Sequence, residues 1–421
     1  MIDIRLIRHN PDQVRHELER RGAEGQLVDR VLALDKERRR LVTQLDDLRH
    51  RRNVLMQTAA PNEQPPPSKS PTAATRELAQ RIRTLRQELK KAEQELAELL
   101  RALPNLPHPS VPPGMDPSAD RIVKQEGAVP RFDFEPQTHE QLAEKLGVLD
   151  FCHAVELAGK GQVYFLGAGS RLVRALVDFM LAVHTRSRGY LEVRSPLVCT
   201  AQAAWQTAHL PAMASGMYAL AKSGYWLVPD GEVPLMQLVA HRTIDTPLPL
   251  RLAGWSVCFR DAGRHARGLL RMHQFESVEL LKCVEAATEM REFEMLVQDV
   301  TEVLQRLEVP YRIVELCAGR LSFAAQKAFR IDVWAAGQKA WLAVSTCRSY
   351  GDFLARRAGV RYRDEAGRVR FVHSMGAAGV ALPHLMVALL ENGQTRQGTV
   401  RLPQALWPFI NGARELGAGE R

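Results

Sequence analysis

Basic side chains gather in a segment near the start of the chain that is expected to form a long helix. Guanidinium groups bind phosphate through paired N–H donors, and a row of them along a helix is typical of a surface that meets a polyanion. Two of these arginines, Arg38 and Arg52, fall on the apolar seam of the helix, where leucine would be preferred for packing alone. The segment is therefore predicted to bind nucleic-acid phosphates, with an ordinary solvated helix face as the alternative. Its basic residues are Arg30, Lys36, Arg38, Arg39, Arg40, Arg49, Arg51 and Arg52.

The cysteines and glycines are the next candidates for chemistry, and their spacing argues against several kinds of site. No two cysteines form a Cys-x-x-Cys pair, and no histidine is placed to complete a zinc site, which predicts reduced thiols and no resident metal. The sequence has neither a Gly-x-Gly-x-x-Gly fingerprint nor a Gly-Lys-Ser/Thr loop. A dinucleotide-binding fold and a P-loop nucleotidase are therefore not indicated. The cysteines are Cys152, Cys199, Cys258, Cys283, Cys317 and Cys347.

Length and charge limit the class of protein that must position these residues. A chain of 421 residues with 45% hydrophobic residues is long enough for a small domain and a large one, each with a core. The 57 Lys and Arg against 48 Asp and Glu give a net charge of +9, which favours a polyanionic partner. No apolar run approaches the roughly 18 residues of a membrane span, and no signal core opens the chain. We expect a cytoplasmic protein without a membrane or DNA partner.

Two series of residues spaced alternately by four and three predict two long helices that pack against each other. A proline-rich stretch at 61–71 separates them, and no helix passes through such a stretch. An antiparallel hairpin with its tip at about 57–74 is the favoured arrangement, and a dimerising coiled coil is the alternative. The first series is Leu34, Arg38, Leu41, Leu45, Leu48, Arg52 and Leu55, and the second is Leu78, Ile82, Leu85, Leu89, Ala92, Leu96 and Leu99.

The pattern of apolar and polar residues changes after a proline-rich linker at 103–117. Beyond it, β-like runs mix with amphipathic helices at 171–184 and 289–306, without a regular βαβ rhythm. This mixture predicts an α+β domain with a mainly antiparallel sheet. The domain prediction is an arm at 1–102, a linker at 103–120 and the α+β domain at 121–421. The expected strands lie at 191–198, 225–228, 255–259 and 275–281.

Several blocks of this second part are similar to a known family. Residues 258–260 together with 267–280 closely resemble motif 2 of bacterial seryl-tRNA synthetases, which are class II aminoacyl-tRNA synthetases. Residues 189–198 resemble motif 1, whose proline-bearing strand builds the family's dimer interface. The resemblance covers nearly the whole chain in the family's order. The other matching blocks are 225–235, which resembles the serine-site loop, 345–357, and the start of the chain at 1–21.

The resemblance implies a fold, a reaction and partners. The fold would be a helical hairpin followed by a class II synthetase domain, in which a mixed, mainly antiparallel sheet is flanked by helices. The reaction would be activation of serine with ATP as seryl-adenylate, with Mg²⁺, and transfer of the seryl group to a tRNA. The partners would be a tRNA of the seryl type, or one with a long variable arm, and a second copy of the chain. The tRNA-binding residues would be Arg38, Arg39, Arg40, Arg49, Arg51 and Arg52.

The resemblance also assigns roles inside the site. Arg260 and Arg271 match the two motif 2 arginines, which makes them candidates for catalysis and ATP binding. Phe275 matches the aromatic residue that stacks on adenine. Glu232 matches the carboxylate that receives the substrate ammonium, and Glu279 matches the carboxylate beside the substrate. The alternative for each residue is an ordinary buried ion pair or a core aromatic.

Several positions depart from the family pattern, among them Arg320 and Arg330, where the family usually has aspartate. His384 stands at the ATP-binding position of the motif 3 arginine, and an imidazole cannot make a bidentate phosphate contact. Ala343 replaces the glutamate that holds Mg²⁺ in the family. Asp230 replaces a threonine of the serine-site loop, so a substrate-binding position carries a new negative charge. Gly376 and Ala378 replace polar residues that frame the serine pocket.

These departures leave three hypotheses open. Loss of one electrostatic clamp costs about 3–4 kcal/mol of transition-state stabilisation, so an impaired or altered reaction is expected. The motif 2 loop at 261–266 is also about four residues shorter than in the family, and the adenine-binding glutamate is missing or displaced to Asp261. The chain is then a divergent serine–tRNA ligase, a catalytically inactive tRNA-binding or regulatory paralogue, or an amino-acid-activating enzyme of changed specificity.

Overall fold

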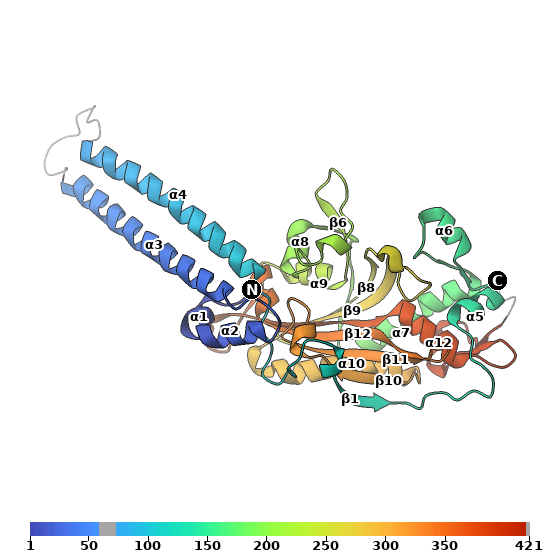
Figure 1. The fold of residues 1–421 in the computed structure, drawn as a ribbon. Coiled ribbons are helices and arrows are strands. Elements are labelled where there is room, and N and C mark those ends of the chain that lie inside the picture. Colours follow the sequence, from blue (N-terminus) through green and yellow to red (C-terminus); the bar gives the residue numbers. More distant parts are fainter. Residues whose placement is uncertain (59–72, 418–421) are drawn as a thin grey trace. The chain divides into compact units, whose positions relative to one another are not determined.

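The computed structural model describes residues 1–58 and 73–417, which form two compact units, Met1–Leu106 and Pro107–Arg421 (Figure 1). The predicted proline-rich tip of the hairpin lies largely outside the described residues. Within those residues, no helix is both long enough and apolar enough to cross a membrane.

The first unit is helical. Two short helices, α1 (Ile4–His9) and α2 (Pro11–Glu19), precede the long helices α3 (Leu27–Thr58) and α4 (Ala73–Ala102). The long helices run antiparallel and side by side, as the four-three spacing predicts (Figure 1). Their seam is closed by apolar residues from both predicted series. Those that are buried are Leu41, Leu45, Leu48, Ile82, Ala92 and Leu96.

A fully buried carboxylate, Asp35, organises the start of α3. Arg8 approaches it with two N–H groups, each 2.7 Å from a carboxylate oxygen. Arg38 lies 3.2 Å and Arg39 3.1 Å from the same carboxylate. The seam position of Arg38 therefore has a packing reason, because its guanidinium pairs with a buried charge of its own helix.

The second unit is built on an eight-stranded sheet in the order β1-β10-β11-β12-β15-β9-β8-β4. Every neighbouring pair is antiparallel except β4 and β8, which confirms the predicted α+β fold with a mainly antiparallel sheet. In sheet order the strands are β1 (Arg121–Glu126), β10 (Tyr311–Glu315), β11 (Lys327–Ala335), β12 (Ala340–Gly351), β15 (His373–Ala381), β9 (Gln274–Val284), β8 (Leu250–Phe259) and β4 (Leu191–Arg194).

Three helices pack against this sheet, α7 (Gly167–Arg188), α10 (Glu289–Arg306) and α12 (Leu382–Gly393). Their apolar faces and the sheet form one core. The predicted strand at 191–198 is interrupted. β4 ends at Arg194, and β5 (Val198–Thr200) pairs with β6 (Tyr225–Leu227) in a separate two-stranded sheet. Pro196 lies in the break and has no N–H to donate to a ladder.

Shorter elements complete this unit. The helices are α5 (His139–Leu146), α6 (Cys152–Ala158), α8 (Ala201–Gln206), α9 (Glu232–Val239) and α11 (Phe353–Ala358). The strands of the small sheets are β2 (Leu149–Asp150), β3 (Tyr164–Phe165), β5, β6 (Tyr225–Leu227), β7 (Thr243–Ile244), β13 (Arg361–Arg363), β14 (Val369–Phe371), β16 (Val400–Arg401) and β17 (Glu415–Leu416).

Candidate active site

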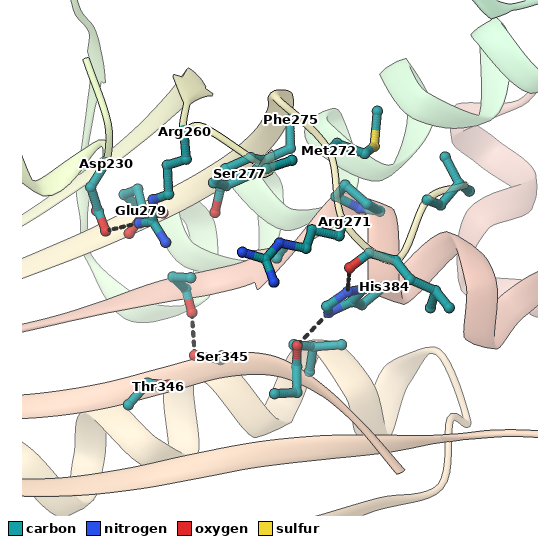
Figure 2. A pocket seen from close by; sticks show the side chains of 18 of the residues that line it. Asp230, Arg260, Arg271, Met272, Phe275, Ser277, Glu279, Ser345, Thr346 and His384 are labelled. Carbon is teal, nitrogen blue, oxygen red and sulfur yellow. Dashed lines mark hydrogen bonds and ion pairs between the residues drawn. The ribbon is translucent and has the colours of Figure 1, made fainter. Parts of the chain in front are cut away.

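Two cavities adjoin on the sheet, and they share the side chains of Asp230, Arg260 and Arg348. The first cavity has a volume of about 340 Å³ and is lined by β9, β12, β15, the start of α12 and the segment 260–273 that connects β8 to β9. Figure 2 shows the side chains of most of its lining residues. The second has a volume of about 320 Å³ and lies beyond the three shared residues. Its other lining residues are Thr207, Ala208, His209, Ala212, Met213, Glu232, Ser322, Phe323, Ala324 and Tyr350.

All seven residues predicted for this site line one or both cavities. Four of them line only the first cavity, namely Arg271, Phe275, Glu279 and His384. Asp230 and Arg260 line both, and Glu232 lines only the second. Four of them lie on β9, α9 (Glu232–Val239) and α12, and the other three lie in the segments that connect such elements, so the fold brings together parts of the site that are separate in the sequence.

Asp230 and Arg260 form an ion pair at the junction of the cavities. The guanidinium donates to an Asp230 carboxylate oxygen at 2.6 Å and to the Pro229 carbonyl oxygen at 2.8 Å (Figure 2). It also lies 5.3 Å from the centroid of the Phe275 ring. Although burial raises the pKa of Asp230, hydrogen bonding from His209 and the charge of Arg260 hold it below its usual range. The charge that replaces the family's threonine thus fixes the orientation of the first motif 2 arginine.

Arg271 differs from Arg260 in having unused donors. Its side chain is exposed and points into the first cavity (Figure 2). Among the described residues, its guanidinium makes no hydrogen bond or ion pair. A cation held in a cavity with its donors unused is suited to binding a phosphate.

His384 is held by backbone on two sides. One ring nitrogen lies 2.6 Å from the Ala343 carbonyl oxygen and the other 2.9 Å from the Leu270 carbonyl oxygen (Figure 2). Carbonyl oxygens only accept, so a ring N–H of His384 is directed at protein backbone. His384 therefore connects β12 to the segment that precedes β9.

The β12 wall of the first cavity offers no carboxylate to a resident Mg²⁺. The β12 positions that line it are Ala343, Val344, Ser345, Thr346 and Arg348, and the Ser345 hydroxyl donates to the Ala378 carbonyl oxygen at 2.5 Å. Over residues 1–58 and 73–417, no three His, Cys, Asp or Glu side chains are grouped to hold a metal ion. Mg²⁺ prefers carboxylate and water oxygens in octahedral geometry, which this wall does not supply.

Two glutamates are buried beside the junction. Glu232 accepts a hydrogen bond from the Tyr350 hydroxyl at 2.8 Å, and its second carboxylate oxygen, Oε1, has no partner among the described residues. Burial, followed by the charge of Asp230, raises the pKa of Glu232 to about 7 and that of Glu279 to about 8. Gly231 makes room for Glu279, because a Cβ there would lie 2.3 Å from its Cγ.

Family models match both units of the chain. The seryl-tRNA synthetase N-terminal domain matches residues 1–107, and the class II core domain of the G, H, P, S and T tRNA synthetases matches residues 219–393. The serine–tRNA ligase of Thermomicrobium roseum is 40% identical, over 99% of this chain and 95% of that protein. The chain belongs to the seryl-tRNA synthetase family. This confirms the resemblance drawn from the motifs.

Other members of the family agree in length and fold. The serine–tRNA ligase of Chloroflexus aurantiacus is 36% identical over 99% of this chain and 100% of its own. The seryl-tRNA synthetase of Pyrococcus horikoshii, solved in complex with ATP, is 30% identical with a TM-score of 0.92, covering 99% of this chain and 100% of that one.

One residue of the site was missed by sequence reasoning. Arg348 lines both cavities, yet none of the motif comparisons with seryl-tRNA synthetases singled it out. A signal was present, because Thr346, Arg348 and Tyr350 alternate along β12 and so share one face of the strand. A cation between a threonine and a buried tyrosine on such a face indicates a polar site.

The arm carries a second set of missed cations. On α3, Arg40 pairs with Glu37 and Arg49 with Asp46, and Arg52 donates to Asn53. Arg51 is exposed and makes no hydrogen bond or ion pair among the described residues. On α4, four exposed arginines make no hydrogen bond or ion pair within the described part of the chain. They are Arg76, Arg81, Arg83 and Arg86, and towards the end of the same helix exposed acids follow, Glu93, Glu95 and Glu98.

We expect Glu232→Gln to stabilise the protein at high pH. A carboxyl with a raised pKa lowers the stability of the fold as pH rises from about 4.5 to about 7, because the unfolded chain ionises first. Removing that charge should raise the free energy of unfolding, relative to wild type, by about 3 kcal/mol more at pH 8 than at pH 5. Urea titrations at the two pH values measure this difference.

The amide still accepts from Tyr350, so the hydrogen bond is kept. Glu294→Gln, at an exposed position of α10, is the matched control and should show no such pH-dependent gain. Equal effects of Glu232→Gln at pH 5 and pH 8 would contradict a raised pKa.

Proposed function

We propose that the chain uses ATP to activate an amino acid and transfers it to a tRNA, at a rate lowered by its altered phosphate contacts. The observation that carries this proposal is that Arg260, Arg271 and Phe275 surround one cavity, with the donors of Arg271 unused. Serine–tRNA ligase is the reaction for which the relatives are named.

The proposed chemistry has two steps, and this chain's residues act on charge in both. In the first step, a carboxylate oxygen of the amino acid attacks the α-phosphorus of ATP and pyrophosphate leaves. Two anions must approach each other, and the cations Arg260 and Arg271 offset their repulsion. In the second step, a ribose hydroxyl of the tRNA attacks the acyl carbon and AMP leaves.

Each subsite has a group of suitable chemistry. The Phe275 ring offers an apolar face for adenine next to the guanidinium of Arg260. Arg271 reaches into the cavity where the phosphates would lie. The free oxygen of Glu232 supports its proposed role as acceptor for the substrate ammonium, since a buried acceptor without a partner gains most from a charged donor.

The rate is expected to be low because two contacts are altered. Both ring nitrogens of His384 lie within hydrogen-bond distance of backbone carbonyl oxygens, and the side chain of Ala343 has no oxygen to bind a metal ion. Each lost clamp costs about 3–4 kcal/mol, or a factor of 10² to 10³ in rate. The same two observations favour a second candidate, a tRNA-binding paralogue that no longer activates amino acids.

The arm and the sheet edge support the proposed partners. A tRNA would meet the exposed arginines of α4 in addition to the α3 arginines predicted from the sequence, of which Arg51 is exposed. A second copy of the chain would pair near β4, an edge strand of the eight-stranded sheet. Leu191 of β4 is 59% exposed, and Val198 of the neighbouring β5 is 44% exposed.

ATP–pyrophosphate exchange tests the activation step. The wild-type chain should show slow exchange that depends on one amino acid. His384→Arg restores a guanidinium at the phosphate end of the cavity and should raise that exchange at least about tenfold. The control is His50→Arg, at an exposed position of α3. No exchange with any amino acid in either protein would refute activation and leave the tRNA-binding paralogue.

Charge reversal on α4 tests the RNA contact. Arg81→Glu, Arg83→Glu and Arg86→Glu together should weaken tRNA binding about 100-fold and flatten its salt dependence, because phosphate contacts release counterions. The readout is the slope of log K against log salt concentration. Reversal of Arg363, Arg368 and Arg370, exposed in the second unit, is the charge-matched control. An unchanged slope in the α4 variant would exclude this face.

A further inference from the structure

The second cavity is much larger than the side chain of serine. Its volume is about 320 Å³, and it begins at the three residues that also line the first cavity. An amino acid whose carboxylate meets ATP at this junction, with its ammonium near Glu232, has only this cavity into which to extend its side chain. Serine, with one carbon and one hydroxyl, would leave most of that volume to water.

Arg348 supplies unused donors at the entrance to this space. It is partly buried on β12, and among the described residues no hydrogen bond or ion pair of its guanidinium is found. Although burial opposes its charge, Tyr350, Asp230, Glu232 and Glu279 together raise the pKa of Arg348, so the group stays cationic. Asp230 does not take up its donors, because that carboxylate is held by Arg260 at 2.6 Å.

The neighbouring polar side chains are already engaged. The Tyr350 hydroxyl donates to Glu232 at 2.8 Å, and the Thr207 hydroxyl donates to the carbonyl oxygens of Ala203 and Ala204. His209 has one ring nitrogen 2.9 Å from the Thr207 hydroxyl. Among the described residues that line this cavity, the guanidinium of Arg348 therefore offers a ligand unused donors, and Glu232 Oε1 offers it an unused acceptor.

We infer that this chain selects an amino acid whose side chain is longer than that of serine and ends in an oxygen acceptor, carboxamide or carboxylate, which Arg348 binds in the second cavity. The inference rests on the proposed activation reaction and names its substrate class. A site built around a polar contact rejects a ligand that lacks the matching group by a factor on the order of 10⁴, because its own group is left unpaired. Arg348 is thus a specificity-determining residue.

Stable analogues of the aminoacyl-adenylate test the inference without catalysis. The probes are sulfamoyladenosines carrying serine, asparagine, glutamine, aspartate or glutamate, titrated calorimetrically into the full chain. At least one of the four longer probes should bind ten or more times more tightly than the seryl probe. Comparing amide with acid at each length distinguishes the two sources of the oxygen.

Variants of Arg348 separate selection from support of the fold. Arg348→Ser should weaken the preferred probe at least tenfold and change the seryl probe less than threefold, whereas Arg348→Lys should keep part of the preference. Arg361→Ser, at an exposed position of β13, is the control. If Arg348→Ser does not fold, Arg348→Lys carries the test, and a preference for the longer probe that is as large in this variant as in the wild type would overturn the inference.

The outcomes distinguish this inference from the proposed function. A seryl probe that binds as tightly as every longer probe overturns the inference and leaves activation standing. Failure to bind every probe, and also sulfamoyladenosine without an amino acid, overturns both. A preference for a longer probe that vanishes in Arg348→Ser supports both.

Discussion

The ion pair between Asp230 and Arg260 is the contact on which the geometry of the site depends. An arginine at the meeting point of two cavities would have many rotamers, and it loses that freedom by bonding to one carboxylate and one backbone carbonyl. The backbone N–H of Glu232 in turn donates to Asp230 at 3.1 Å, so the carboxylate is itself fixed. The boundary between the cavities is therefore set by Asp230, at a position where the motif comparison predicts threonine in the family.

Charge is nearly balanced across this boundary. The three carboxylates of Asp230, Glu232 and Glu279 lie near the two guanidiniums of Arg260 and Arg348. Burial raises the pKa of both glutamates. An ammonium bound as proposed would stabilise the ionised form of Glu232, so its binding would favour release of a proton.

Much of the fold and part of the site could be predicted from the sequence. The four-three spacing of leucines predicts the hairpin, since a narrow apolar seam needs a partner helix. Arg260, Arg271 and Phe275 were found because their motif is local. Arg348 was not, because the charged residues around it, Asp230, Arg260 and Glu279, come from other segments of the chain, and only the fold brings them together. The contacts of His384 were equally hidden, since backbone carbonyls leave no signature in a sequence. Arg38 was explained incompletely, because Asp35 accounts for its place on the seam.

The distribution of charge along α4 has a kinetic consequence. Arginines lie on the part of the helix that follows the proline-rich segment, and glutamates lie towards its other end, so the helix carries a lengthwise dipole of side-chain charges. A polyanion approaching from a distance is turned by such a field before any contact forms, and its encounter rate depends on ionic strength. Since the glutamates would repel a polyanion at the other end, an RNA that binds the arm as proposed would be oriented during its approach as well as in the complex.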